Sequence, residues 1–538
     1  MNNDTLPRIS ASQVHHTLRD GGEIALLDVR EEAPFAEGHP LWAANLPAGR
    51  IELDAWRRIP RRDTLIAVYD NRESLAEPAA RTLQALGYTR VHLLADGLQG
   101  WKDAGLELFI DVNVPSKSFG EWLEAERHTP SLPAEQVQAL IDTGADMVVL
   151  DARRWDEYQT MSIPTGVSVP GAELVLRAQA LAPSPSTHIV VNCAGRTRSI
   201  IGTQSLLNAG LPHRITALRN GTIGWLLAGQ RLDHGASRRP PEVTPAQRAQ
   251  AAERARAVAD RAGVRRATAA DLQRFAAEGQ RTTYRFDVRT SEEYATGHLP
   301  GFRHYAGGQL VQETDHAAPV RGARIVLADD DGVRANMTAS WLAQMGWEAW
   351  VLDDTADSAD FTETGEPAHD HPALPAPVFN VPPATLAQWM QEDDEAGGAQ
   401  STVVLDFTTS ASYAQRHIPG ARWLLRSQLP QALASVPRAR RYVVTCGTSL
   451  LARYAAQAVA QATGAPVFAL DGGTQAWIAA GLPLERGETH LASPRIDRYR
   501  RPYEGTDAPR SAMQAYLDWE FGLVEQLKRD GTHGFRVI

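Results

Sequence analysis

The sequence predicts an α/β fold of four similar units in one chain, each a mostly parallel sheet flanked by helices, followed by a C-terminal helical tail. A short apolar strand that ends in Asp occurs four times, and Asp28, Asp151, Asp287 and Asp406 are 123, 136 and 119 residues apart. These separations exceed solenoid periods and match the size of a small domain. Strands alternate with helical patterns in every unit, which favours parallel sheets covered by helices.

Each unit runs through the same elements. A capped helical pattern, such as "SASQVHHTL" in the first unit, precedes the strand that ends in Asp. A second strand, a turn and a helix follow, as in "HIVVNCAGRTRSIIGTQSLLNAG". Three units close with "DGLQGWKDAG", "NGTIGWLLAG" and "DGGTQAWIAAG", whereas the third runs into the acidic "DDTADSADFTETGEP". The predicted domains span residues 8–112, 127–236, 264–366 and 378–488, with an extension over 489–538.

Three segments connect the units. Residues 115–130 join the first two, Thr244 and Pro245 cap a helix that runs to about Gly263, and a Pro/His-rich connector spans 367–380. In the tail a helix is predicted from Pro509 to about Arg529. We expect it to dock on the protein rather than anchor in a membrane, because the face opposite its apolar residues is acidic. Its apolar positions are Met513, Tyr516, Leu517, Phe521, Val524 and Leu527.

The composition narrows the classes of function. The 538 residues include 64 acidic and 54 basic ones, for a net charge of −10, and the charges are interspersed, which argues against nucleic-acid binding. The sequence contains no run of about 18 apolar residues, so a membrane span is not predicted. The polar start "MNNDTLPRIS" is not typical of a signal peptide. Two cysteines suit neither a disulfide framework nor a metal site. We therefore expect a cytoplasmic protein with no cofactor, metal, nucleic-acid partner or membrane, and a homodimer stays open.

One cysteine stands at a position suited to a reactive thiol. In "VVNCAGRTRSII", four strand-forming residues precede Cys193 and a helical stretch begins near Ser199. Cys193 therefore lies at a strand-to-helix turn, beyond the carboxyl end of a parallel strand, where ligands bind in such sheets. Backbone N–H groups and the helix dipole would stabilise a thiolate there.

The repeated motifs resemble the rhodanese family of sulfurtransferases. The resemblance is carried by the Asp-Val-Arg strand, "EEYATGHLPG", the strand that ends in Cys before a six-residue loop, and the closing segment with its Trp, and it covers about residues 8–488 in four copies. Family members with two such domains pair an inactive domain that has Asp at the nucleophile position with an active domain that has Cys. The equivalent positions here are Asp70, Cys193, Asp329 and Cys446, which resembles two two-domain rhodaneses in series.

The resemblance implies a thiosulfate sulfurtransferase. Such an enzyme moves a sulfane sulfur from thiosulfate, or a related donor, to a thiophilic acceptor such as cyanide or a thiol. Cys193 would form a persulfide, and the helix start and nearby cations would lower its pKa. Arg196 and Arg198 would attract an anionic donor, and the loop N–H groups would cradle the persulfide. The expected substrate-binding residues are Ala194, Gly195, Arg196, Thr197, Arg198 and Ser199.

The loop of Cys446 differs. It reads "CGTSLLA", has no cation before Arg453, and resembles the uncharged loop of mercaptopyruvate sulfurtransferases. Inert packing is the alternative for this thiol, because the loop is apolar and its spacing is shifted by one residue. If Cys446 is active, we expect a carboxylate-bearing donor held by Arg422 or Arg426. Its expected binding residues are Gly447, Thr448, Ser449, Leu450 and Leu451.

Two other functions fit parts of the sequence. Phosphatases of this fold need Cys, five residues and then Arg, but Ser199 and Ala452 stand six positions after the two cysteines. Sulfur chemistry is therefore favoured over phosphate chemistry. A non-catalytic or regulatory role, as a persulfide carrier or an interaction scaffold, is the remaining alternative.

The two units without a cysteine are expected to be structural. A carboxylate cannot carry a persulfide, so the units of Asp70 and Asp329 would form the second wall of each cleft. Arg30 and Arg289 would make structural ion pairs in these units.

Overall fold

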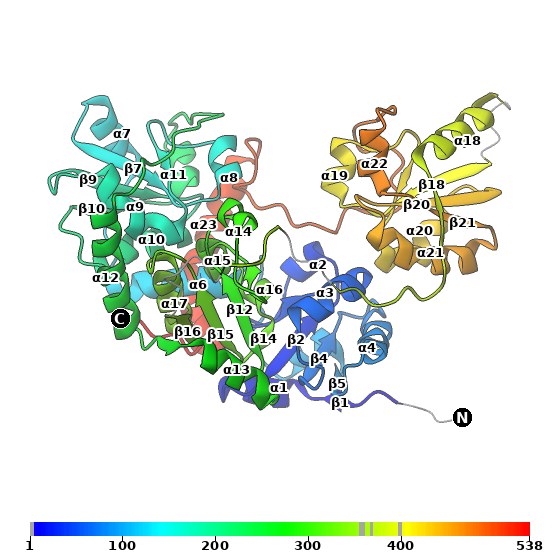
Figure 1. Ribbon diagram of the computed structural model, residues 1–538, viewed down its shortest axis with the longest axis horizontal. Helices are drawn as coiled ribbons and strands as arrows, with labels where there is room; N and C mark the ends of the chain where they lie inside the picture. Colours follow the sequence, from blue (N-terminus) through cyan, green and yellow to red (C-terminus); the bar gives the residue numbers. More distant parts are fainter. Residues whose placement is uncertain (1–4, 354–360, 366–369, 396–400) are drawn as a thin grey trace.

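The computed structural model describes residues 5–353, 361–365, 370–395 and 401–538. Within these residues the chain forms four sheets of mostly parallel strands, one for each repeat, with helices packed against them (Figure 1). The predicted α/β class is confirmed. We call the repeats units 1 to 4 in chain order.

Unit 1 is built around the strand that carries Asp28. Every residue of Ile24–Asp28 (β2) is buried, as in a central parallel strand. The strand order is β1-β5-β4-β2, with β3 also paired to β2. Arg30 forms an ion pair with Asp28 at 2.5 Å, as expected. The other elements are β1 (Arg8–Ile9), α1 (Ala11–Arg19), α2 (Glu32–Ala36), β3 (Ala44–Asn45), the 3-10 turn η1 (Ala48–Arg50), α3 (Ile51–Arg58), β4 (Ile66–Tyr69), α4 (Ala76–Ala85), β5 (Val91–Leu94) and α5 (Gly97–Asp103).

Unit 2 repeats this order with a five-stranded sheet, β6-β10-β9-β7-β8. Its central strand His188–Asn192 (β9) is buried throughout and leads directly to Cys193. Helix Thr197–Asn208 (α10) follows the cysteine loop and is mostly buried. The other elements are β6 (Ser131–Leu132), α7 (Ala134–Asp142), β7 (Met147–Asp151), α8 (Trp155–Thr160), β8 (Val167–Ser168), η2 (Gly171–Glu173), α9 (Leu174–Leu181), β10 (Ile215–Leu218) and α11 (Gly221–Leu227).

Unit 3 has the strand order β11-β16-β15-β12-β13. Arg289 pairs with Asp287 at 2.7 Å, again as expected. A short extra strand, Val320–Arg321 (β14), leaves this unit and pairs antiparallel with β2 of unit 1. The other elements are β11 (Arg265–Ala267), α13 (Ala269–Glu278), β12 (Thr283–Asp287), α14 (Ser291–Thr296), β13 (Arg303–His304), α15 (Gly307–Gln312), α16 (Thr314–Ala317), β15 (Arg324–Ala328), α17 (Arg334–Gln344) and β16 (Glu348–Leu352).

Unit 4 has the order β17-β21-β20-β18-β19. It lacks the ion pair of the other units, because Thr408 stands where they have arginine. Burial raises the pKa of Asp406 to about 7. The elements are β17 (Phe379–Val381), α18 (Pro383–Glu395), β18 (Thr402–Asp406), α19 (Ser410–Gln415), β19 (Arg422–Trp423), η4 (Arg426–Gln428), α20 (Leu429–Ala434), β20 (Arg441–Thr445), α21 (Leu450–Thr463), β21 (Val467–Leu470) and α22 (Gly473–Ala479).

Three long helices lie outside the units. Thr244 caps Pro245–Arg261 (α12), which confirms the helix predicted there. Residues 115–130, read as a connector, instead form most of a helix, Val114–Arg127 (α6), whose first half is buried. The predicted tail helix is Arg510–Asp530 (α23), and it packs on α6. Among the described residues no helix is long and apolar enough to cross a membrane.

The apolar face of α23 differs in one place from the prediction. Met513, Tyr516 and Leu517 are buried as expected, but Phe521 is 53% exposed. The buried position beside it is taken by Glu520, an acidic residue that the sequence pattern placed on the outer face. The red C-terminal segment in Figure 1 runs from unit 4 back to unit 2, where α23 lies.

The units do not pair in chain order, which corrects the expectation of two rhodanese pairs in series. In unit 2, η2 packs on α15 of unit 3, and in unit 1, η1 packs on η4 of unit 4. Gly171 and Gly307 begin equivalent segments, 136 residues apart, so units 2 and 3 meet through the same part of the fold. Helix α6 joins units 1 and 2, and α12 joins units 2 and 3 and packs on α9 and α17.

Candidate functional site

Cys193 lies at the end of β9, and its loop is held by a close backbone approach. The N–H of Thr222 donates to the carbonyl of Cys193 at 2.9 Å. Gly221, which precedes it, has a φ of +55°, and a Cβ there would lie 2.3 Å from the same carbonyl oxygen. Only glycine fits this position, which explains the Asn-Gly that opens the closing segment of the unit.

The thiol of Cys193 is nearly enclosed. The residue is 2% exposed, and its Sγ contacts Ser199 Oγ at 3.4 Å. Burial raises the pKa of this thiol, while Arg198 and the side chain and backbone N–H of Ser199 pull it down. The net direction is upward, which corrects the expectation of a lowered pKa in this conformation. The reason is the loss of water around the sulfur, which outweighs the nearby cation.

The two loop arginines are already paired with carboxylates. Arg196 makes a two-point contact with Glu121 of α6, at 2.7 and 2.9 Å, and also contacts Glu124. Arg198 bonds both carboxylate oxygens of Glu157, at 2.7 and 2.8 Å. The attraction of the donor by these two arginines therefore stays a prediction. Arg196 is bound into the contact between unit 2 and α6, whereas Arg198 lowers the pKa of the thiol and Glu520 raises it.

A small cavity of about 20 Å³ adjoins the sulfur, and half of its wall comes from outside unit 2. This volume is close to that of one water molecule. The expected loop residues Ala194 to Arg198 line it. No motif indicates the other lining residues, because they reach the site from distant segments. These are Ser116 and Lys117 of α6, Gln312 of α15, and Tyr503 and Tyr516 of the C-terminal extension.

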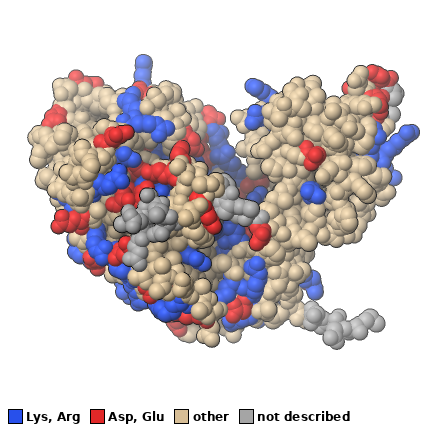
Figure 2. Space-filling view, viewed as in Figure 1, with Lys and Arg blue, Asp and Glu red and all other residues tan. Residues whose placement is uncertain are grey.

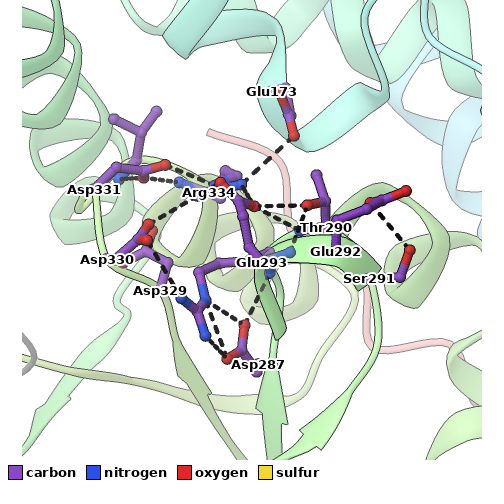
Figure 3. A network of polar contacts seen from close by, with 12 residues as sticks. Glu173, Asp287, Thr290, Ser291, Glu292, Glu293, Asp329, Asp330, Asp331 and Arg334 are labelled. Carbon is purple, nitrogen blue, oxygen red and sulfur yellow. Dashed lines mark hydrogen bonds and ion pairs between the residues drawn. The ribbon is translucent and has the colours of Figure 1, made fainter. Parts of the chain in front are cut away.

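The nucleophile position in unit 3 shows what the loop holds when no thiol is present (Figure 3). Asp329 accepts N–H bonds from Gly332 at 3.1 Å and Ala335 at 2.8 Å. In unit 1, Asp70 accepts from Arg72, Leu75 and Ala76 at 3.1, 2.6 and 3.0 Å. Both side chains thus fill the loop with acceptor oxygens, and burial, together with the nearby Asp331, raises the pKa of Asp329 well above its usual range.

The same N–H recurs in all four loops. It belongs to the residue six positions after the nucleophile position: Ala76, Ser199, Ala335 and Ala452. In the two cysteine units it is directed at sulfur and lowers the pKa of the thiol. The four loops therefore share one anion-holding geometry.

The pair of Arg198 and Glu157 also has a counterpart in unit 3. Arg334 and Glu293, each 136 residues further along, contact each other at 2.6 Å. Figure 3 shows Arg334 among several carboxylates, including Glu173 of unit 2 at 3.5 Å. Because the pair recurs in a unit without a thiol, its first role is structural, at the contact between units 2 and 3.

The Cys446 site is more open than the Cys193 site. Cys446 is 6% exposed, but Thr448 in its loop is exposed and Gly447 half-buried. Burial raises the pKa of the thiol, and the N–H groups of Ala452, Leu451 and Thr448 lower it. Ser449 has a φ of +66° and donates to the carbonyl of Leu470, so it braces the loop. Leu450 and Leu451 begin α21 at the loop's end.

The arginines suggested for a carboxylate donor at Cys446 are placed elsewhere. Arg426 bonds both oxygens of Glu52 in unit 1, at 2.6 and 2.7 Å. It therefore serves the contact between units 1 and 4. Arg422 lies on β19, the edge strand of the sheet.

Neither the surface charges in Figure 2 nor the metal-ligating side chains of the described residues indicate another binding site. On the face shown in Figure 2, basic and acidic side chains are interspersed, without an extended basic surface. Within the part of the chain that the structure describes, no group of three or more His, Cys, Asp or Glu side chains is placed to hold a metal ion.

Comparisons with known proteins agree with this architecture. The family model for the rhodanese-like domain matches residues 10–104, 133–228, 268–355 and 385–480. A crystal structure of thiosulfate sulfurtransferase from Pseudomonas aeruginosa is 64% identical, covers 99% of this chain and 100% of its own, and has a TM-score of 0.96. No curated protein matches the chain.

Two of the other solved structures match about a fifth of the chain each. A rhodanese-related protein from Thermoplasma volcanium is 20% identical and covers 20% of this chain and 97% of its own, with a TM-score of 0.17. A rhodanese-like domain protein from Staphylococcus aureus is 20% identical, covers 21% and 100%, and has a TM-score of 0.18. With four matched domains and a relative of the same length and architecture, the chain belongs to the rhodanese family.

Proposed function

We propose that this protein is a thiosulfate sulfurtransferase in which Cys193 carries the transferred sulfur as a persulfide. The full-length relative from Pseudomonas aeruginosa supports the activity. Cys193 is preferred to Cys446 because Lys117 and Arg198 line its cavity, and both cations favour an anionic donor.

The observation that carries the persulfide step is the Asp in the other two loops. The oxygens of Asp70 and Asp329 lie two bonds from Cβ and take the loop N–H groups. The outer sulfur of a cysteine persulfide also lies two bonds from Cβ and bears the negative charge. A persulfide on Cys193 would therefore present its charged atom to the same set of N–H donors.

The reaction balances in two steps. The Cys193 thiolate attacks the outer sulfur of thiosulfate, a new S–S bond forms, and the S–S bond of thiosulfate breaks with its electron pair leaving on sulfite. A thiophilic acceptor, cyanide or a thiolate, then attacks the outer sulfur of the persulfide, and the electron pair of that S–S bond returns to Cys193. Ping-pong kinetics follow, because donor and acceptor use the thiol in turn.

Two features of the site assist these steps. Arg198 offsets the negative charge that Cys193 carries as thiolate and as persulfide. The N–H of Ser199 at the start of α10 adds the positive end of a helix dipole.

Cys446 is a second candidate sulfur carrier. The specific observation in its favour is the set of three loop N–H groups, from Thr448, Leu451 and Ala452, that lower the pKa of its thiol. The buried Asp406 acts in the opposite direction and raises that pKa. We therefore propose that Cys446 reacts weakly with a dianion such as thiosulfate. Arg426 is not available to hold the carboxylate of mercaptopyruvate at this site, because it pairs with Glu52. We propose the non-catalytic scaffold role for units 1 and 3 only.

Variants of each thiol test this assignment. Cys193→Ser should abolish nearly all thiosulfate-dependent thiocyanate formation, and Cys446→Ser should keep most of it. The assay is thiocyanate production at saturating cyanide over a range of thiosulfate concentrations. Full activity in Cys193→Ser would refute the assignment, and loss in Cys446→Ser alone would move the function to unit 4.

A further inference from the structure

Lys117 brings a positive charge to the Cys193 cavity from outside the four units. It lies on α6, between units 1 and 2, and it lines the same cavity as Cys193 and Arg198. Its side chain is 3% exposed. A lysine is almost never buried this deeply without a specific partner or task.

The surroundings of Lys117 hold it charged and in place. Its Nζ donates to Asp111 Oδ1 at 2.6 Å. It also lies 5.8, 5.2 and 5.5 Å from the ring centres of Tyr503, Tyr516 and Trp519, all in the C-terminal extension. Burial lowers the pKa of Lys117, but Asp111 and Tyr503 more than offset this, so the net direction is upward.

Lys117 has fewer hydrogen bonds to carboxylates than the two loop arginines have. Arg196 and Arg198 each bond both oxygens of a glutamate, so one edge of each guanidinium is already occupied. An ammonium has three N–H donors in different directions. One of them bonds Asp111, and aromatic rings lie within cation–π distance of the group.

We propose that Lys117 recognises the anionic end of the sulfur donor and so determines the affinity of the Cys193 site for thiosulfate. This inference rests on the proposed function and deepens it, because it names the residue that binds the oxygens of the donor. The donor class is a sulfane sulfur bonded to an oxyanion group. The outer sulfur would face Cys193, and the oxyanion group would face Lys117.

The cavity beside Cys193 has a volume of about 20 Å³ for water-sized molecules. Tyr503 and Tyr516 belong to the C-terminal extension and form the wall on the side of Lys117. The oxyanion group of the donor would meet the ammonium beside these rings.

The test measures persulfide formation against thiosulfate concentration in the full chain. Lys117→Met removes the charge, but it leaves the buried Asp111 unpaired and risks the fold. The double variant Asp111→Asn/Lys117→Met removes both charges and keeps the fold testable, and Lys117→Arg keeps the charge. Lys528→Met, on an exposed part of α23, is the matched control for the loss of one lysine.

The readout is the fraction of protein that gains one sulfur atom, by intact mass, as thiosulfate is raised. The double variant should need about 10- to 100-fold more thiosulfate for half loading, which is the usual range for a lost charged hydrogen bond. Lys117→Arg should lie between it and the wild type, and Lys528→Met should match the wild type. The rate at which cyanide removes sulfur from preloaded protein should be unchanged in Lys528→Met, and in the double variant it should fall by a smaller factor than loading does.

Two failures are distinguishable. If the wild type gains no sulfur at Cys193, the proposed function fails. If the wild type loads and the double variant loads at the same thiosulfate concentrations, the function stands and the role of Lys117 is refuted. An equal loss in the cyanide step would also overturn the inference, because a general structural defect would then explain both.

Discussion

The buried carboxyl of Glu520 should make the docking of α23 weaken as the pH rises. Glu520 is fully buried beside the Cys193 loop, and its Oε1 accepts from the hydroxyl of Tyr516 at 2.9 Å. Its Oε2 has no hydrogen-bond partner and lies 3.4 Å from the place of a Cβ at Gly195. Burial, with a contribution from the nearby Glu121, raises the pKa of Glu520 to about 8, while Lys117 and Arg196 act in the opposite direction.

The sign and size follow from the two states of this helix. The pKa is about 8 when α23 is docked and near 4.5 when it is open to water. The neutral carboxyl is tolerated in the docked state, so stability is fully present below about pH 4.5 and is lost as the pH rises through 8. Between pH 6 and pH 8 the loss amounts to about 2 kcal/mol, which is about a 50-fold change in local opening.

Hydrogen exchange of α23 measures this opening in the full chain. Glu520→Gln keeps the shape and removes the titration, so the exchange rate of the wild type relative to this variant should rise about 50-fold between pH 6 and pH 8. Taking the ratio cancels the intrinsic pH dependence of exchange. Glu525→Gln, on the exposed side of the same helix, is the control and should track the wild type. A ratio that does not change with pH would refute the reasoning.

Three further outcomes are expected. Arg196→Met should destabilise the protein by about 3–5 kcal/mol, because it leaves buried Glu121 unpaired, and Arg196→Met/Glu121→Gln should recover most of this in thermal unfolding. If Arg196→Met keeps its stability and only the KM for thiosulfate rises, Arg196 binds the donor instead. Asp70→Ala should cost about 3 kcal/mol, because three loop N–H groups lose their acceptor, whereas Asp70→Asn should cost less; an unchanged stability in Asp70→Ala would show that these hydrogen bonds do not hold the loop. Tyr516→Ala should speed alkylation of Cys193 by iodoacetamide, followed by peptide mass mapping, and an unchanged rate would mean that this ring does not limit access.

The repeating fold was readable from the sequence because it depends on local patterns. Strands such as Ile24–Asp28 are short apolar runs, and the Asp that ends each run recurs at domain-sized intervals. The ion pair between Asp28 and Arg30 was expected because the two residues lie on one strand end, two positions apart. The cysteine positions followed from the same repeat.

The assembly of the units was not readable in the same way. Nothing local to Gly171 or Gly307 indicates that their segments pack together, since that contact depends on where α6 and α12 carry the chain. Residues 115–130 look like a connector because they contain Pro, Ser and Gly, yet they form a buried helix between α10 and α23. Helix propensity was overridden there by packing on both sides.

The site itself was half predicted. The loop from Ala194 to Ser199 follows from the motif, but the partners of its arginines do not, because Glu121 is 75 residues away in sequence from Arg196. Lys117 and Tyr503 are also far from the thiol along the chain, at 76 and 310 residues from Cys193, and carry no motif. The acidic residues of α23, Glu520 among them, are expected on its outer face because acidic residues usually lie there. Glu520 is buried instead, and its raised pKa keeps the carboxyl neutral near pH 7.

The most direct test of the central claim is peptide-mapped mass spectrometry of the full chain after treatment with thiosulfate. The account predicts that the peptide containing Cys193 gains one sulfur atom, that cyanide removes it with release of thiocyanate, and that the peptide containing Cys446 gains far less at the same thiosulfate concentration. A sulfur found on Cys446 with none on Cys193, or no added sulfur on either thiol, would contradict it.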